Sequence, residues 1–507
     1  MPEYDIPRLV KMVKNGEIGI PELQREFVWS DNRVCELAES IYKNYPIGLI
    51  TLYRVPSELR SNQERYWVLD GQQRLLSLSL IMEGEIEAMR RGRQEVIRRD
   101  IWFDPKNERF ELRAPRKGEN WIKLSELLQI QGRAELESLL RKENFDFQEQ
   151  ERISTLWATF RRDYKVLVHE LPEDFELDDL GNIFVRTNFS GTRVKGADVY
   201  STIIAVRYGG LVRELRGFCA KLPIEIDYGV LIRTFIAFIT GGKVKLASRV
   251  LEQADKLSSV LEKRKENMEY LLEKVKENVS QTMSLLEEMG IDGLPTENVV
   301  PVMAYYFYKR SPLPDMERKG LFKWFILASF FGRYSSSVET KLDEDLSTIE
   351  RGGSYKDLIK NIEYIEGNLK ERIKEFIDRG EGGSLLLYAL LRESNAKDFL
   401  PPHEPITRGN SVVHHIFPLS HLIGSRYEQL SSDIGNLTLI TSQSNQRLSN
   451  KLPENYLPEV PSEILKSHYI PEDRECWKLG KIEEFIEQRK KLLKDAVESF
   501  FRDICKS

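Results

Sequence analysis

Two adjacent histidines, His414 and His415, are the residues of this chain best suited to chemistry. They stand near the start of a stretch, residues 412–453, that continues through Asn436, beside a glycine, to Asn445. Cutting a phosphodiester requires a base that activates water, a divalent cation that neutralises charge on the phosphate, and a scaffold that aligns the two. Imidazole nitrogens and carboxamide oxygens can supply the base and the ligands. The stretch therefore predicts a metal-dependent nuclease site.

The elements that must position these side chains follow the order strand, strand, helix. The apolar run 411–417 predicts a strand, which Pro418 ends. Residues 433–436 predict a turn, residues 437–441 a second strand, and residues 442–448 the opening of a helix. Because consecutive strand residues point to opposite faces, one histidine can face a metal ion and the other the attacking water.

This pattern resembles the HNH, or ββα-metal, nuclease motif, whose usual form is Asp-His-Ile-x-Pro, then Asn-Leu, then a helix bearing Asn or His. The resemblance implies that His415 is the general base, that His414 and Asn445 are metal ligands, and that Asn436 is structural. Bonds from Asn436 to backbone groups would brace its turn. His414 stands where an acidic residue is usual, and histidine favours softer ions over Mg²⁺. We expect a divalent cation, Mg²⁺ or Mn²⁺, and leave its identity open.

A pair of adjacent histidines on its own is more often an ordinary core or surface pair. Four motif elements in the right order favour the nuclease interpretation here. Three of the six histidines in the chain also fall within eight positions, His421 being the third. His421 and His403 have no place in the motif, and we expect both in loops.

A second cluster, Asp-Gly-Gln-Gln-Arg at residues 70–74, is suited to binding phosphate. An apolar strand leads into its glycine turn and an apolar helix follows, an arrangement that offers backbone N–H groups to phosphate oxygens. Arg74 can bind phosphate. Asp70 can hold a cation or a water, while Gln72 and Gln73 can read a base or orient a nucleophile. The alternative is structural, with Asp70 capping the helix and Arg74 forming an ion pair.

Two further polar clusters stand between apolar elements, PxLQRxFxW at residues 21–29 and RTNxxG at residues 186–191. In this order the three clusters resemble the N-terminal domain of the GmrSD family of modification-dependent restriction endonucleases, a ParB-like and sulfiredoxin-like fold, over about residues 1–215. The HNH segment resembles the second half of the same family. The resemblance implies nucleotide binding or hydrolysis, with Asp70 and Arg74 catalytic, coupled to cleavage of modified DNA. The nucleotide-binding residues it implies are Gln24, Arg25, Asp70, Gly71, Gln72, Gln73, Arg74, Arg186 and Asn188.

At 507 residues the chain exceeds the size of one core, so several domains are expected. We predict an α+β multidomain protein: a ParB-like nucleotide-binding domain at 1–215, an all-helical domain at 216–395, and a ββα-metal HNH nuclease domain at 396–507. The four cysteines form no CxxC pair, which argues against disulfides and structural zinc. Without a bilayer-spanning apolar run or a signal peptide, we expect a cytoplasmic protein that contacts no membrane.

The net charge of −5 requires any DNA-binding surface to be local. Residues 90–117 concentrate positive charge and are the best candidate, although a solvated helix face and a charged hairpin edge explain them equally well. The amphipathic segment 481–501 is expected to pack its apolar side on the protein. The second choice is a DNA-facing role for its basic residues Arg489, Lys490, Lys491 and Lys494.

From these features we predict an endonuclease of a phage-defence, modification-dependent restriction type. Its HNH domain would cleave DNA with a divalent metal, under control of NTP binding or hydrolysis in the N-terminal domain, with GTP or ATP as effector or substrate. The expected partners are DNA, in modified phage form, and a nucleotide, and a homodimer is allowed. The alternative function is a nucleotide-controlled DNA-sensing regulator whose HNH unit is weakened or inactive.

Overall fold

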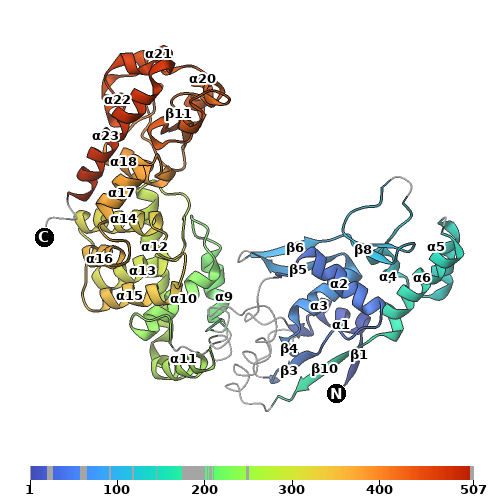
Figure 1. Cartoon of the computed structure of the whole chain (residues 1–507). Helices are drawn as coiled ribbons and strands as arrows, with labels where there is room; N and C mark the ends of the chain where they lie inside the picture. The colour runs from blue at the N-terminus through green and yellow to red at the C-terminus, as the bar shows by residue number, and fades with distance from the viewer. Residues whose placement is uncertain are drawn as a thin grey trace. The chain divides into compact units, whose positions relative to one another are not determined.

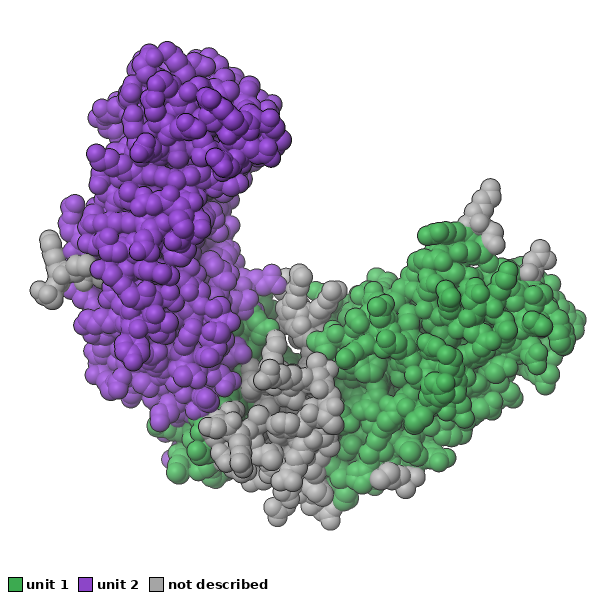
Figure 2. All heavy atoms as spheres, viewed as in Figure 1, with its two compact units in different colours: residues 1–221, 227–232, 246–265 green, residues 222–226, 233–245, 266–507 purple. Residues whose placement is uncertain are grey.

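The computed structural model describes residues 2–19, 27–57, 65–90, 93–116, 119–143, 145–173, 200–201, 204, 208, 210–246 and 250–502. The chain forms two compact units (Figures 1 and 2). Unit 1 comprises residues 1–221, 227–232 and 246–265, and unit 2 comprises residues 222–226, 233–245 and 266–507. No helix in the described part of the chain is both long and apolar enough to cross a membrane.

Unit 1 is built on a mixed five-stranded sheet with the order β1-β10-β3-β4-β2. β1 and β10 are antiparallel, as are β3 and β4, whereas β10 and β3 are parallel and so are β2 and β4. The strands are β1 (Glu3–Asp5), β2 (Ile18–Gly19), β3 (Ile50–Arg54), β4 (Tyr66–Asp70) and β10 (Lys165–Leu171).

Three helices cover one face of this sheet, α1 (Ile6–Lys14), α2 (Asp31–Tyr42) and α3 (Gln72–Glu83). Side chains alternate along the strands, so Leu52 and Val68 pack in the core between the sheet and the three helices. Tyr53 and Leu69 pack together on the opposite face of the sheet. α3 is buried on every side, which explains why its sequence is apolar nearly all round and shows no amphipathic period.

Unit 1 contains further elements. They are β5 (Glu85–Arg90), β6 (Arg93–Arg98), β7 (Trp102–Asp104), β8 (Arg109–Glu111), β9 (Ile122–Lys123), α4 (Leu124–Gln129), α5 (Arg133–Lys142), α6 (Phe147–Ala158), α9 (Leu211–Cys219) and α11 (Val250–Arg264). β5 and β6 form an antiparallel hairpin, and β7 pairs with both β8 and β9. Of the two structural explanations for the basic segment 90–117, the helix face is therefore wrong. The described part of the segment consists of strands and the loops between them.

Unit 2 is mostly helical, in agreement with the predicted helical middle of the chain. α10 (Tyr228–Thr240) is divided between the two units. The helices that follow in unit 2 are α12 (Met268–Glu288), α13 (Val299–Arg310), α14 (Asp315–Phe330), α15 (Val338–Glu350), α16 (Tyr355–Glu366), α17 (Leu369–Asp378) and α18 (Gly383–Glu393). α14 is buried along most of its length, as its apolar sequence predicts.

The C-terminal part of unit 2 contains a two-stranded antiparallel sheet and short helices around a core of its own. Its elements are β11 (Ser411–His415), α19 (Leu419–Leu422), β12 (Leu437–Thr441), α20 (Ser442–Leu448), α21 (Pro453–Tyr456), α22 (Ser462–Ser467) and α23 (Ile482–Phe501). Figure 1 shows β11 and α20 at the same end of unit 2 as α21 and α22. The architecture is thus mixed α and β in more than one unit, and the predicted boundaries at 215 and 395 stay predictions.

Candidate active site

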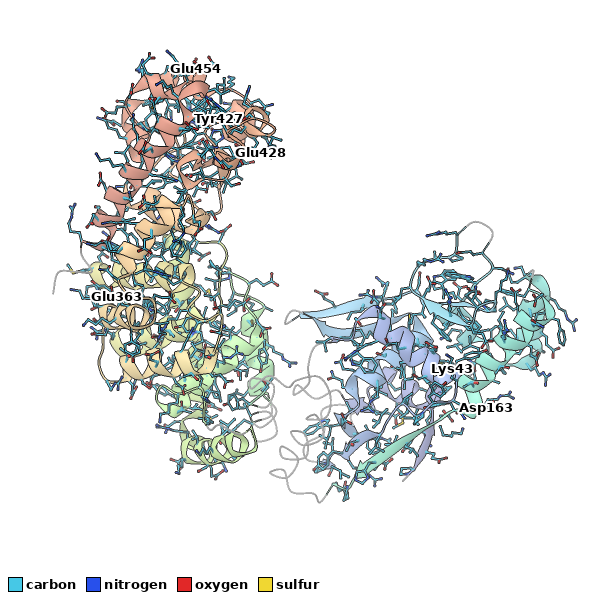
Figure 3. All side chains as sticks on the ribbon, viewed as in Figure 1. Lys43, Asp163, Glu363, Tyr427, Glu428 and Glu454 are labelled. Carbon is cyan, nitrogen blue, oxygen red and sulfur yellow. The ribbon has the colours of Figure 1, made fainter. Side chains whose placement is uncertain are left out.

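The strand, strand, helix order predicted around the two histidines is present. β11 and β12 pair antiparallel, with His414 opposite Thr438 and His415 opposite Leu437. α20 begins directly after β12, because the Thr441 side chain accepts a hydrogen bond from the Ser444 amide and so caps the helix. In Figure 3 the labels Tyr427 and Glu454 mark this part of unit 2.

The His414 ring is in the protein interior and both of its nitrogens have partners. The side chain is 2% exposed, its Nδ1 lies 2.8 Å from Asn445 Oδ1, and its Nε2 lies 3.2 Å from the Tyr456 hydroxyl. Burial lowers the pKa of His414 to about 4, so the ring is neutral at neutral pH. The structure therefore brings together the two residues predicted as metal ligands.

The neighbouring histidine, His415, is half-buried, in keeping with the alternation of side chains along a strand. Burial lowers its pKa, so the ring keeps a free nitrogen lone pair at neutral pH. No described residue forms a hydrogen bond with this ring. A neutral, accessible imidazole of this kind can accept a proton from water.

The Asn436 side chain is fully buried and bonds only to backbone. Its Oδ1 accepts from the Phe417 amide at 2.8 Å, and its Nδ2 donates to the carbonyls of Phe417 and Ser431 at 3.1 and 3.2 Å. These bonds join the end of β11 to the turn before β12. Asn436 therefore fixes the distance between the two strands that carry the site.

Arg489, on α23, holds the same turn. The fully buried guanidinium donates to the carbonyls of Ile434, Gly435, Leu437 and His468 at 2.7–3.4 Å, and burial lowers its pKa to about 9. This burial excludes the DNA-facing role considered for Arg489. Two of its neighbours, Lys490 and Lys494, pair with Asp433 and Asp378.

Asp398, which the sequence did not single out, anchors α20. Its buried carboxylate accepts from the Thr441 amide and hydroxyl at 3.0 and 2.7 Å and from the Ser444 hydroxyl at 2.5 Å. A carboxylate at a helix N-terminus is also favoured by the helix dipole. Because Asn445 is the next residue after Ser444, Asp398 positions the carboxamide that faces His414. A short polar residue far from the motif carries no sequence signal for this role.

The imidazole nitrogen of His414 and the carboxamide oxygen of Asn445 suit a hard or borderline divalent cation that would take its other ligands from substrate and water. His414 Nδ1 and Asn445 Oδ1 lie 2.8 Å apart. No group of three His, Cys, Asp or Glu side chains capable of holding a metal occurs within the described ranges. Mg²⁺ and Mn²⁺ commonly use one or two protein ligands and complete their shells with phosphate oxygens and water. The two residues therefore fit such an ion.

The N-terminal cluster lies at the end of β4. Gly71 adopts φ +89°, a left-handed conformation that glycine tolerates, and α3 starts immediately after it. Arg74 Nη2 donates to Asp70 Oδ2 at 2.9 Å, and Arg74 Nη1 donates to the Ile47 carbonyl at 3.1 Å. About a fifth of each side chain in this ion pair remains exposed.

The Gln73 side chain joins this cluster to the segment before α2, since its Oε1 accepts from the amides of Val28 and Trp29 at 2.9 and 3.2 Å. Arg74 packs against Gly48, where a Cβ atom would lie 2.2 Å from Nη1. Asp70 provides no side-chain cap to α3, so that part of the structural alternative is wrong, whereas the ion pair it proposed is present. The remaining predicted nucleotide-binding residues, Gln24, Arg25, Arg186 and Asn188, lie outside the described residues.

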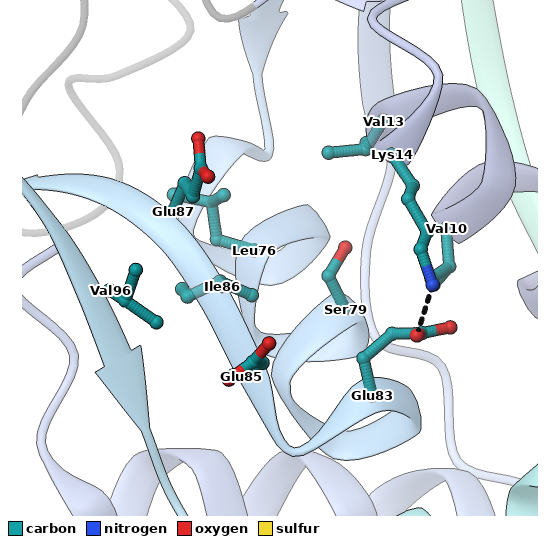
Figure 4. Close-up of a pocket in the computed structure, with 10 residues that line it drawn as sticks. All are labelled: Val10, Val13, Lys14, Leu76, Ser79, Glu83, Glu85, Ile86, Glu87 and Val96. Carbon is teal, nitrogen blue, oxygen red and sulfur yellow. Dashed lines mark hydrogen bonds and ion pairs between the residues drawn. The ribbon is translucent and has the colours of Figure 1, made fainter.

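Two pockets of unit 1 lie close to these elements. One, of about 340 Å³, is bounded by α1, α3 and the β5–β6 hairpin and contains the Lys14–Glu83 ion pair (Figure 4). The other, of about 440 Å³, is lined by residues 27–32 with Ile97 and Arg99. Neither includes Asp70 or Arg74.

Comparison with known proteins gives two family matches. Residues 6–205 match the N-terminal domain of the GmrSD restriction endonuclease, and residues 366–496 match the C-terminal domain of the GmrSD restriction endonucleases. The chain is also similar to an uncharacterized protein of Methanocaldococcus jannaschii, with 23% identity over 94% of this chain and 89% of the relative. The first match contains the Asp70–Arg74 cluster, and the second contains β11, β12 and α20.

Proposed function

Because the chain belongs to the GmrSD restriction endonuclease family, we propose that it is a DNA endonuclease whose cutting site is the strand, strand, helix unit at residues 411–448. The observation that carries this proposal is the contrast between adjacent histidines. His414 is buried against Asn445, whereas His415 is half-exposed with a lowered pKa. The arrangement separates a ligand from a base, as phosphodiester hydrolysis requires.

His415 acts as the general base in this proposal. Its neutral ring takes a proton from water as the water oxygen forms a bond to phosphorus and the opposite P–O bond breaks, after which the leaving oxygen is protonated from solvent. Asn436 and Arg489 keep β11 and β12 in register, so the ring holds its position. Positioning of this kind lowers the entropic part of the barrier.

His414 and Asn445 are the residues that would hold a divalent cation. When bound there, the cation neutralises charge on the scissile phosphate and on the leaving oxygen. The imidazole ligand favours Mn²⁺ over Mg²⁺ relative to the acidic residue usual at this position.

DNA contacts are proposed near the same site. Arg447 on α20 and Lys451 beyond it are exposed, and neither forms an ion pair with a described residue. The basic segment of unit 1 is only partly neutralised, because Lys106 and Arg109 are exposed and form no ion pair with a described residue. Arg98, Arg99 and Arg113 there each pair with carboxylates at 2.7–2.9 Å.

In unit 1 we propose NTP binding, with GTP or ATP, at the Asp70–Arg74 cluster. The glycine turn that opens α3 and the partly exposed ion pair support it, because phosphate can replace the carboxylate as the partner of Arg74. Binding or hydrolysis there would control cutting in unit 2.

The second candidate function is a nucleotide-controlled DNA-sensing regulator with an inactive HNH unit. One observation favours it: His414 Nδ1 and Asn445 Oδ1 lie 2.8 Å apart inside the protein, so a proton on Nδ1 would join them in a hydrogen bond and leave no ligand pair for a metal. Plasmid nicking separates the two candidates. Modified and unmodified plasmids should be incubated with Mn²⁺ or Mg²⁺, with and without GTP and ATP. Metal-dependent nicking supports the endonuclease, and nucleotide-dependent DNA binding without nicking supports the regulator.

A further inference from the structure

Tyr456 lies outside the strand, strand, helix unit, at the end of α21, yet its hydroxyl reaches the centre of the site. The side chain is 2% exposed. The hydroxyl donates to the Ile416 carbonyl at 3.1 Å and lies 3.2 Å from His414 Nε2. Tyr456 therefore bonds at once to the backbone beside β11 and to a predicted metal ligand.

The protons of this contact can be assigned by counting donors. A carbonyl oxygen only accepts, so when the Tyr456 hydroxyl donates to the Ile416 carbonyl its single proton is used and none is left for His414. The contact between Tyr456 and His414 then requires Nε2 to donate. A neutral imidazole carries one N–H, so the lone pair of the ring is on Nδ1. That lone pair faces Asn445 Oδ1 at 2.8 Å.

Two electron-pair donors at this distance repel each other unless the carboxamide turns its nitrogen toward the ring or a cation lies between them. A second proton on the ring would also relieve the repulsion, but the partners of the ring among the described residues are Asn445 and Tyr456, and neither is a carboxylate that could pair with the charge. Asp398, a carboxylate whose charge acts on His414, already accepts three hydrogen bonds from Thr441 and Ser444.

We propose that Tyr456 is a positioning residue that holds His414 in the Nε2–H tautomer, so that Nδ1 and Asn445 Oδ1 present their lone pairs to a divalent cation. The inference rests on the proposed nuclease function and extends it. Outer partners of this kind set the tautomer of a ligating histidine, and their loss typically lowers metal affinity roughly 10- to 100-fold. In the opposite tautomer, Nδ1–H would donate to Asn445 and close the site.

The test compares Tyr456→Phe with wild type and with Tyr469→Phe. Tyr469 is a matched control because its hydroxyl also donates to a backbone carbonyl, that of Leu390 at 2.8 Å, in the same unit. Long-range ¹H–¹⁵N correlation spectra of metal-free, ¹⁵N-histidine-labelled protein report the tautomer of His414, which a His414→Asn variant assigns. Titration with Mn²⁺, followed by electron paramagnetic resonance, reports affinity without any nuclease assay.

The expected results are an Nε2–H tautomer in wild type and Tyr469→Phe, an Nδ1–H tautomer in Tyr456→Phe, and Mn²⁺ affinity reduced about 10- to 100-fold in Tyr456→Phe alone. An Nδ1–H or doubly protonated ring in wild type overturns the inference, and this spectrum decides the matter even if the variant does not fold. Equal losses of Mn²⁺ affinity in both variants also overturn it. Failure of the proposed function gives a different result, an Nε2–H wild-type ring in a protein that neither binds Mn²⁺ nor nicks DNA.

Discussion

Acid should destabilise unit 2 through His468, which is fully buried. His468 Nε2 donates to the Lys397 carbonyl at 2.8 Å, and Nδ1 accepts from the Thr438 hydroxyl at 2.7 Å, so the folded ring has no place for a second proton. Burial lowers its pKa to about 3, and the charge of Arg489 acts in the same direction. Asp398 opposes this shift.

Proton linkage gives the direction in which pH changes the stability of the fold. Below pH 6.5 the unfolded chain protonates this histidine while the folded chain does not, so stability is retained above that pH and is lost as the pH falls toward about 3. Between the two pKa values, each pH unit changes the free energy of unfolding by about 1.4 kcal/mol. Two units below pH 6.5, this residue should therefore lower the free energy of unfolding by about 2–3 kcal/mol.

His468→Gln isolates this contribution, because glutamine can keep the bond to the Lys397 carbonyl and cannot be protonated. Its loss of the Thr438 contact lowers stability equally at every pH. Urea unfolding at pH 7 and 4.5, followed by hydrogen exchange of unit 2 peptides, should show that wild type loses about 2–3 kcal/mol more than the variant. If the free energy of unfolding falls equally in wild type and in His468→Gln between pH 7 and 4.5, His468 is not a neutral buried ring.

Three further predictions concern the two sites. His414→Asp should shift the metal preference of nicking from Mn²⁺ toward Mg²⁺, and an unchanged or more Mn²⁺-dependent profile would count against His414 as a ligand. The rate of nicking should fall on the acid side only below the usual histidine range, since burial lowers the pKa of His415; an acid limb above pH 6.5 would contradict this. Asp70→Ala and Arg74→Ala should abolish nucleotide hydrolysis with an unchanged melting temperature, whereas a large fall in melting temperature with normal hydrolysis would leave only a structural ion pair.

The strands and helix of the nuclease site could be predicted from the sequence, because turn residues and local periodicity determine them. The second strand and the helix have the predicted bounds, Leu437–Thr441 and Ser442–Leu448, and the first strand ends two residues early at His415. Turn residues and local periodicity also predicted the strand before Gly71 and the helix after it, which are β4 and α3.

The side chains that hold the site in place could not be predicted in this way. Asp398, Tyr456 and Arg489 act on atoms that are distant in the chain, through contacts that exist only once the core has packed. Arg489 is the clearest case. On an amphipathic helix an arginine is expected to face solvent, and the carbonyls of the turn at 434–437 that accept from the guanidinium explain its burial.

The central claim, that His415 is the base of a DNA-cutting site, is tested most directly by plasmid nicking with His415→Ala. The control is His421→Ala, which removes an exposed histidine of the same region that bonds to the Asn450 carbonyl at 3.1 Å. With Mn²⁺ present, His415→Ala should keep the wild-type melting temperature and lose about 10²- to 10⁴-fold in nicking rate, while His421→Ala retains it. Nicking by folded His415→Ala at the wild-type rate would contradict the claim.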